Sequence, residues 1–190
     1  MGLASLTLPD PGKVIGIDAS TNSIAYAIFD KGKPERCGEI TLNGATVEER
    51  IGDAGAKIDA LVSSGIMDGD YIAIESAVFV NNRQVVIKLA YVFGAIMGGL
   101  VRDGRKIVRV PPIEWQTGIG NPNLTKDERA QLKADNPGKS ATWLKAAGRE
   151  KRKQRTMTIA RQYFDIPSNS DNISDAVGIA LYASTNLVKQ

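Results

Sequence analysis

The sequence predicts an α/β fold in which three antiparallel strands precede a strand–helix–strand unit. Two apolar runs, at residues 13–19 and 23–30, are joined by a short polar link, and a third strand follows near residues 36–42. Two more apolar strands, near residues 70–76 and 106–110, flank a long helix. Because a strand, a helix and a strand in this order indicate a right-handed parallel crossover, we expect a mixed sheet.

Four helices complete the pattern. Thr46 and Glu49 have the spacing of a capping box, and the helix that they begin ends near Gly65. A second helix, residues 82–103, has almost no polar face, so it is expected to be buried on more than one side, with a subunit interface as one of them. A basic helix follows the region 118–138, and a final helix spans residues 172–188.

Length and composition indicate one domain. The chain has 190 residues, and we expect a loose leader over residues 1–12 and a single domain over residues 13–190, with a loop insertion near 118–138 that contains a short helical segment. One cysteine excludes an intrachain disulfide and fits the cytoplasm, with an organellar matrix as the alternative. No segment has the length and apolarity of a membrane span. The absence of histidine excludes a Ser-His-Asp triad and a histidine-ligated zinc site.

Positive charge is concentrated in one segment. Residues 139–155 hold seven basic side chains and one acidic one, although the whole chain has a net charge of only +3. Such a stretch favours a polyanionic partner, and a solvated helix face is the alternative.

Carboxylates occur at unusual places in the pattern. Asp18 closes the first strand, Glu75 closes the fourth, and Asp175 begins the apolar part of the last helix, with Asp171 one turn before it. Taken singly, each carboxylate could cap a turn or a helix, or pair with a lysine. Adjacent strands lie about 4.8 Å apart, so carboxylates at two strand ends would repel each other unless a cation lay between them. An all-oxygen site suits Mg²⁺ or Mn²⁺.

Three motifs carry a family resemblance. "IGIDASTNSIAYAIFD", "YIAIESAVFVNN" and "DNISDAVGIALYA" resemble, in order and spacing, the RuvC-type Holliday junction resolvases of the RNase H-like superfamily. The insertion near 118–138 and the departures at Asn172 and Trp115 make the chain similar to a phage or organellar branch of this family. The resemblance implies a five-stranded mixed sheet, three antiparallel and then two parallel strands, flanked by helices. It also implies a homodimer through the helix at 82–103 and branched DNA, a four-way junction, as the partner.

The resemblance also implies the site residues. Asp18, Glu75 and Asp175 match family acids that bind two Mg²⁺ ions, for which Mn²⁺ can substitute, and Lys153 matches a lysine near the scissile phosphate. Phe79 matches an aromatic residue that stacks on a base, with core packing as the alternative. Further DNA contacts are expected from the following residues: Asn82, Arg149, Lys151, Arg152, Arg155.

This chain departs from the family pattern at two positions. The family's second acid on the last helix falls at Asn172, and we favour Asp171 as the fourth ligand, with Asn172 as the alternative. A basic residue expected after the fifth strand is Trp115 here, which offers a second stacking surface instead.

The leading hypothesis is therefore a metal-dependent endonuclease that resolves four-way junctions. Paired symmetric nicks would leave 5′-phosphate and 3′-hydroxyl ends. The alternatives are a nuclease of the same fold that acts on other branched DNA or on RNA–DNA hybrids, and a junction-binding protein without catalysis.

Overall fold

A single mixed sheet organises the molecule. The structure, a computed structural model, describes residues 12–76, 83–102, 104, 106–167 and 170–186. The strands are β1 (Lys13–Ala19), β2 (Ser23–Asp30), β3 (Lys33–Thr41), β4 (Tyr71–Glu75) and β5 (Ile107–Val110), in the spatial order β3-β2-β1-β4-β5. β1, β2 and β3 pair antiparallel, whereas β4 lies parallel to β1 and β5 parallel to β4. The predicted five-stranded RNase H-like arrangement is confirmed.

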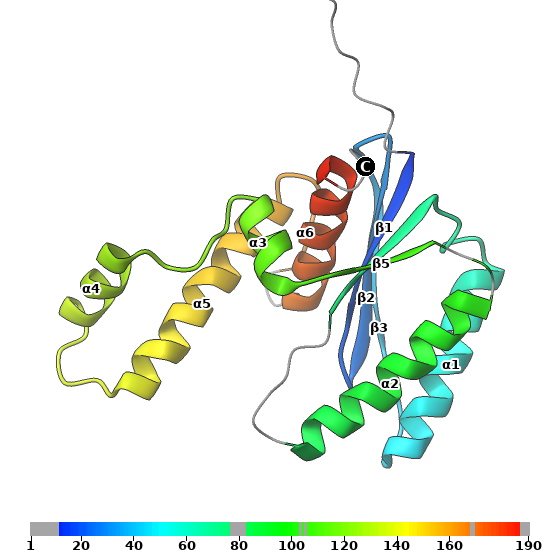
Figure 1. Cartoon of the computed structure of the whole chain (residues 1–190), viewed down its shortest axis with the longest axis horizontal. Coiled ribbons are helices and arrows are strands. Elements are labelled where there is room, and N and C mark those ends of the chain that lie inside the picture. Colours follow the sequence, from blue (N-terminus) through cyan, green and yellow to red (C-terminus); the bar gives the residue numbers. More distant parts are fainter. Residues whose placement is uncertain (1–11, 77–82, 103, 105, 168–169, 187–190) are drawn as a thin grey trace, which may run out of the picture.

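Helices cover both faces of this sheet (Figure 1). The long helices α1 (Val47–Ser63) and α2 (Arg83–Arg102) lie on one face. On the other face lie α6 (Asp171–Asn186) and the short α3 (Pro112–Gly118). α4 (Lys126–Ala134) and the outer part of α5 (Ala141–Ala160) extend away from the sheet on the α6 side.

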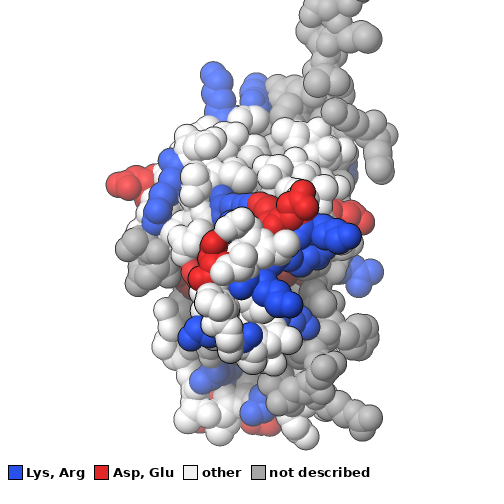
Figure 2. All heavy atoms as spheres, turned by 90° about the vertical axis from the view of Figure 1, so that its left-hand side faces the viewer, with Lys and Arg blue, Asp and Glu red and all other residues white. Residues whose placement is uncertain are grey.

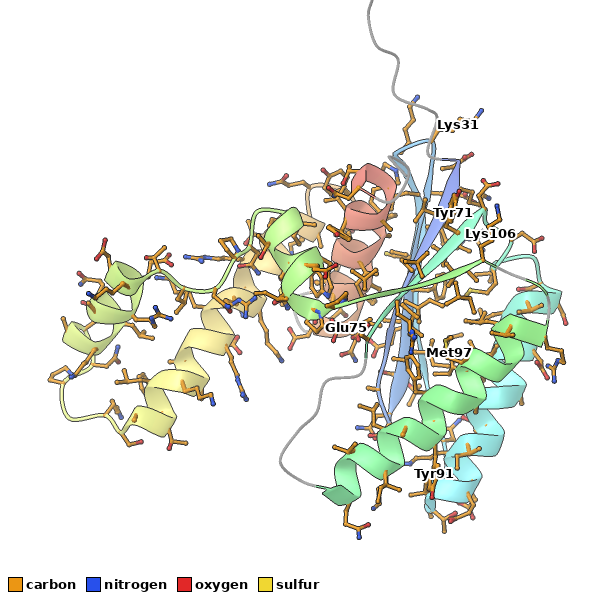
Figure 3. The ribbon with its side chains drawn as sticks, in the orientation of Figure 1. Lys31, Tyr71, Glu75, Tyr91, Met97 and Lys106 are labelled. Atoms are coloured by element: carbon orange, nitrogen blue, oxygen red, sulfur yellow. The ribbon has the colours of Figure 1, made fainter. Side chains whose placement is uncertain are left out.

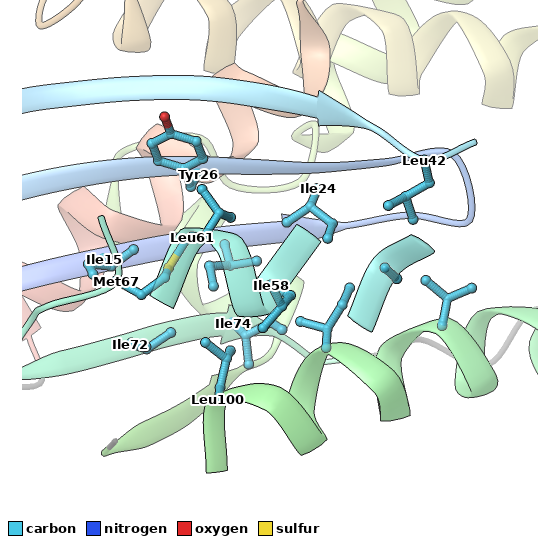
Figure 4. Packing of buried hydrophobic residues seen from close by; sticks show 14 of the residues in the cluster. Ile15, Ile24, Tyr26, Leu42, Ile58, Leu61, Met67, Ile72, Ile74 and Leu100 are labelled. Atoms are coloured by element: carbon cyan, nitrogen blue, oxygen red, sulfur yellow. The ribbon is translucent and has the colours of Figure 1, made fainter. Parts of the chain in front are cut away.

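The two faces are packed by side chains of different size. The α1–α2 face is filled by large aliphatic residues (Figure 4), which include Ile15, Ile17, Ile72, Ile74, Ile58, Leu61, Ile96 and Leu100. The α6 face is lined partly by small residues such as Ala25, Ala27 and Ala180. A side chain at Gly16 would place its Cβ 2.4 Å from the backbone oxygen of Ala176, so glycine lets α6 approach β1 closely.

Several boundaries test the sequence predictions. The capping box of Thr46 and Glu49 is confirmed, and α4 occupies part of the expected loop insertion at 118–138. α3 was not predicted, because Pro111 and Pro112 were interpreted as the end of a strand, although proline is also favoured in the first turn of a helix.

α2 has a buried side and an exposed apolar side in the single chain. Val92, Ile96 and Leu100 are buried, whereas Ile87, Tyr91 and Val101 are 43%, 57% and 58% exposed. A single chain does not show what covers these apolar side chains, so the homodimer through α2 stays a prediction. No helix among the described residues is long and apolar enough to cross a membrane.

Candidate active site at the ends of β1 and β4

Sheet register brings two carboxylates side by side. Ile17 of β1 lies opposite Ile74 of the parallel strand β4, so the next residues along the two strands are Asp18 and Glu75. Side chains alternate between the faces of a strand, and Asp18 therefore shares the face of Gly16, which α6 covers. Parallel strands end at the same edge of a sheet, so both acids lie where β1 and β4 finish.

α6 adds a third carboxylate to this edge. Ala176 and Ala180 of α6 lie against Gly16, one alternate position before Asp18 on β1. Asp175 directly precedes Ala176, so the first turns of α6 reach the ends of the strands. The predicted grouping of Asp18, Glu75 and Asp175 is thus placed around one edge by a close strand–helix contact.

The three carboxylates influence one another's protonation. Burial, then the charges of Asp175, Glu75 and Glu39, raise the pKa of Asp18 well above its ordinary value. Burial, followed by repulsion from Glu75, raises the pKa of Asp175 to about 7. Burial also raises the pKa of Glu75. Ionising all three in the metal-free protein is therefore unfavourable.

Glu39 extends the acidic row across the sheet. Asp18 lies opposite Ala25 of β2, and Ala25 lies opposite Glu39 of β3, which places Glu39 two strands away on the same face. Sequence reasoning missed Glu39, because a bulge between Ile28 and Phe29 shifts the pairing of β2 with β3 and the position cannot be counted from the hairpin.

Trp115 of α3 fixes the orientation of Glu75 (Figure 3 labels Glu75 at the end of β4). The indole Nε1–H donates to Glu75 Oε2 over 2.7 Å, which opposes the effect of burial on the pKa of Glu75. Trp115 is fully buried, and its ring lies against α6 where a Cβ at Gly178 would be 2.6 Å from Cζ3. The prediction that Trp115 offers a stacking surface to DNA is wrong, because a buried ring has no face free.

Asp171 and Asn172 point to different partners. Lys153 Nζ donates to Asp171 Oδ2 over 2.7 Å, and this bond raises the pKa of Lys153. Asn172 Nδ2 donates to Ser23 Oγ over 2.9 Å and to Glu39 Oε1 over 2.6 Å. Asp171 also contributes to the raised pKa of Asp175, so Asp171 belongs electrostatically to the acidic group.

Basic residues of α5 adjoin the acids. A hollow of about 180 Å³ is lined by Gln116, Arg149, Arg152, Lys153, Thr156 and Asp175. Arg152 also donates to Gln116, and Arg155 pairs with Glu128 of α4. Lys151 is exposed outside this lining. Phe79 and Asn82 lie outside the described residues.

The oxygen atoms of these acids are the ligand type that a hard divalent cation prefers. Asp18, Glu75, Asp171 and Asp175 supply only carboxylate oxygens, and their mutual repulsion is the cost that a cation would relieve. No group of three or more potential ligands within the described ranges is already gathered closely enough to hold an ion. Trp115 donates to one oxygen of Glu75, and Lys153 donates to one oxygen of Asp171.

Comparisons with solved structures identify the fold. RuvC of Thermus thermophilus in complex with a Holliday junction substrate aligns with a TM-score of 0.60 at 14% identity, over 94% of this chain and 97% of that one. The chain has the RuvC fold. A second Thermus thermophilus RuvC structure aligns with a TM-score of 0.59 at 16% identity, over 90% and 92% of the two chains.

RuvC-like architecture extends to a mitochondrial protein. The yeast mitochondrial Holliday junction resolvase Ydc2 aligns with a TM-score of 0.53 at 8% identity, over 94% of this chain and 80% of that one. No protein-family model matches this chain, and a search of curated proteins finds no match. The similarity therefore lies in the fold.

Proposed function

We propose that this protein is a metal-dependent endonuclease that resolves four-way DNA junctions. The observation that carries the proposal is the grouping of Asp18, Glu75 and Asp175 at one sheet edge, beside the basic residues of α5. Acids whose pKa values are raised by burial together with neighbouring charges cluster at catalytic sites. The RuvC fold, one example of which is bound to a Holliday junction, makes branched DNA the favoured substrate.

The acids are proposed as the metal ligands. Asp18, Glu75, Asp175 and Asp171 would hold two Mg²⁺ ions, or Mn²⁺ in their place. Held by these residues, the ions would supply a water nucleophile and charge stabilisation at the departing 3′ oxygen, and the products would carry 5′-phosphate and 3′-hydroxyl ends. The present hydrogen-bond partners of Glu75 and Asp171 are Trp115 and Lys153.

Residues of α5 are proposed to hold the DNA backbone. Lys153 lies within hydrogen-bond distance of Asp171 and close to Asp175, where its ammonium group can attract the scissile phosphate. Arg149 and Arg152 line the same hollow and are placed to bind a neighbouring phosphate. These cations attract an anionic strand to a site that would otherwise repel it.

A homodimer would place two such sites on one junction. We infer that α2 forms the interface, because Ile87, Tyr91 and Val101 are exposed apolar side chains on one long helix. A two-fold dimer matches the two symmetry-related strands of a four-way junction, and paired symmetric nicks follow.

A substrate panel tests the proposal. Labelled four-way junction, three-way junction, linear duplex and RNA–DNA hybrid are incubated with the protein and Mg²⁺. We expect nicking of the four-way junction at a rate well above the others. Preferential cleavage of the hybrid or the three-way junction would instead support another nuclease of this fold, and tight junction binding without nicks would support a non-catalytic binding protein.

A further inference from the structure

A second, larger hollow lies between α4 and α5. It has a volume of about 620 Å³, within the range of small-ligand sites, and it lies in the part of the molecule that extends away from the sheet. Glu128 of α4 pairs with Arg155 of α5, so an ion pair joins the two helices that form its walls. The four-carboxylate site does not include this hollow.

The lining combines apolar and cationic groups. Leu124, Leu132 and Leu144 contribute apolar surface, and Gly148 keeps the wall of α5 low where a Cβ would meet Leu124 at 3.1 Å. Five basic residues also line it, and no described lining residue is acidic: Arg129, Lys133, Lys145, Arg149, Arg152. Figure 2 looks onto this end of the molecule and shows basic side chains across it, with acidic ones between them.

Two arginines connect this hollow to the acidic site. Arg149 and Arg152 line both the large hollow and the small one that contains Lys153 and Asp175. Arg152 Nε is buried and has no hydrogen-bond partner among the described residues, so one donor of this guanidinium is unsatisfied. A strand bound at the acids can therefore continue past Arg152 and Arg149 into the large hollow.

We propose that the hollow between α4 and α5 receives an unpaired nucleotide of the DNA strand whose phosphate lies at the acidic site. A paired duplex presents phosphate, sugar and only the edges of its bases, so the cationic rim can bind it but the stacked base faces cannot cover the leucines. An unpaired nucleotide also presents the faces of its base, and their burial against Leu132 and Leu144 removes apolar surface from water. The inference rests on the proposed function and gives the region 118–138 a role in substrate recognition.

The test compares strands with and without bases. Binding of a short oligothymidine strand and of an abasic strand of the same length and charge is measured by fluorescence anisotropy in EDTA, where no cleavage occurs. We expect the wild-type protein to bind the strand with bases about tenfold more tightly, which corresponds to burial of roughly 55 Å² of apolar surface. Equal affinity for the two strands would overturn the proposal without any protein variant.

Variants locate the effect. Leu132→Gln removes one of the two leucines without changing charge, so it should reduce the preference for bases about threefold and leave abasic binding within about twofold. Trp143→Gln is the matched control, because Trp143 is a 39% exposed residue of α5 that does not line the hollow. Loss of the preference in Trp143→Gln but not in Leu132→Gln would contradict the proposal, and circular dichroism checks that both variants fold.

Junction nicking, measured in parallel with Mg²⁺, separates the two proposals. Normal nicking without any preference for bases would overturn the hollow's role alone. A preference for bases that depends on Leu132, without nicking, would instead contradict the endonuclease function and leave the hollow as a strand-binding site.

Discussion

Trp115 Nε1 lies 2.7 Å from Glu75 Oε2, and this hydrogen bond joins α3 to the end of β4. The indole is fully buried against α6, so it holds the carboxylate from a rigid position. We interpret Trp115 as a positioning residue for Glu75, which replaces the predicted role in stacking on DNA.

Replacement of Trp115 by phenylalanine tests this interpretation. The variant keeps an aromatic ring but loses the N–H donor, and a hydrogen bond to a charged group contributes about 1.5–3 kcal/mol. A double-mutant cycle with Glu75→Ala, measured by denaturant unfolding, should give a coupling free energy of about 1–2 kcal/mol. Purely additive losses would show that the contact contributes no coupling. Mn²⁺ affinity of Trp115→Phe, measured by calorimetry, should fall below that of the wild type.

Stability of the metal-free protein should fall as pH rises. Asp175 has an ordinary pKa of 3.8 when unfolded and a pKa of about 7 when folded, so between these values the folded protein binds more protons than the unfolded chain. The favourable contribution is complete below about pH 4 and is lost as pH rises through about 7. Denaturant unfolding of wild type and Asp175→Asn across this range should show a steeper decline for wild type. Parallel curves would contradict the raised pKa.

Asp171 and Asn172 should separate metal binding from stability. Asp171→Asn removes a proposed ligand charge and should weaken Mn²⁺ binding measured without DNA. Asn172→Ala loses the hydrogen bonds to Ser23 and Glu39, so its unfolding free energy should fall by about 1–2 kcal/mol while Mn²⁺ affinity stays close to wild type. The reverse pattern would assign the fourth ligand to Asn172.

Lys153 should affect cleavage far more than folding. Its pair with Asp171 is largely solvent-exposed, so Lys153→Gln should change the unfolding free energy by less than about 1 kcal/mol. Loss of a charge at the scissile phosphate should slow junction cleavage by about 100-fold. Arg161→Gln, which removes an exposed charge just beyond α5, is the control and should cleave at nearly the wild-type rate. Equal effects of the two variants would indicate only a general loss of positive charge.

Local sequence signals predicted much of the fold. The capping box at Thr46 and the apolar runs of the first two strands are recognisable from neighbouring residues, and the structure confirms both. α3 was missed because consecutive prolines occur both after strands and at the start of helices. An apolar sequence does not reveal what covers each side of a helix, so the predicted subunit contact over the exposed side of α2 stays a prediction.

The site was predictable only in part for a related reason. Asp18 and Glu75 end strands, which a sequence pattern can reveal, whereas the contact between Trp115 and Glu75 spans 40 residues. The row from Asp18 to Glu39 depends on the register of three strands, and a hairpin bulge between Ile28 and Phe29 shifts that register. Tertiary contacts of this kind leave no local signal.

Cleavage of an immobile four-way junction is the direct test of the proposed metal-dependent endonuclease activity. Both strands of one symmetry-related pair are labelled, and the protein is added with Mg²⁺ beside an Asp18→Asn control and an EDTA control. We expect paired nicks at symmetric positions, with religatable 5′-phosphate ends, and no nicks in either control. Nicking that persists unchanged in Asp18→Asn, or that needs no divalent metal, would contradict this proposal.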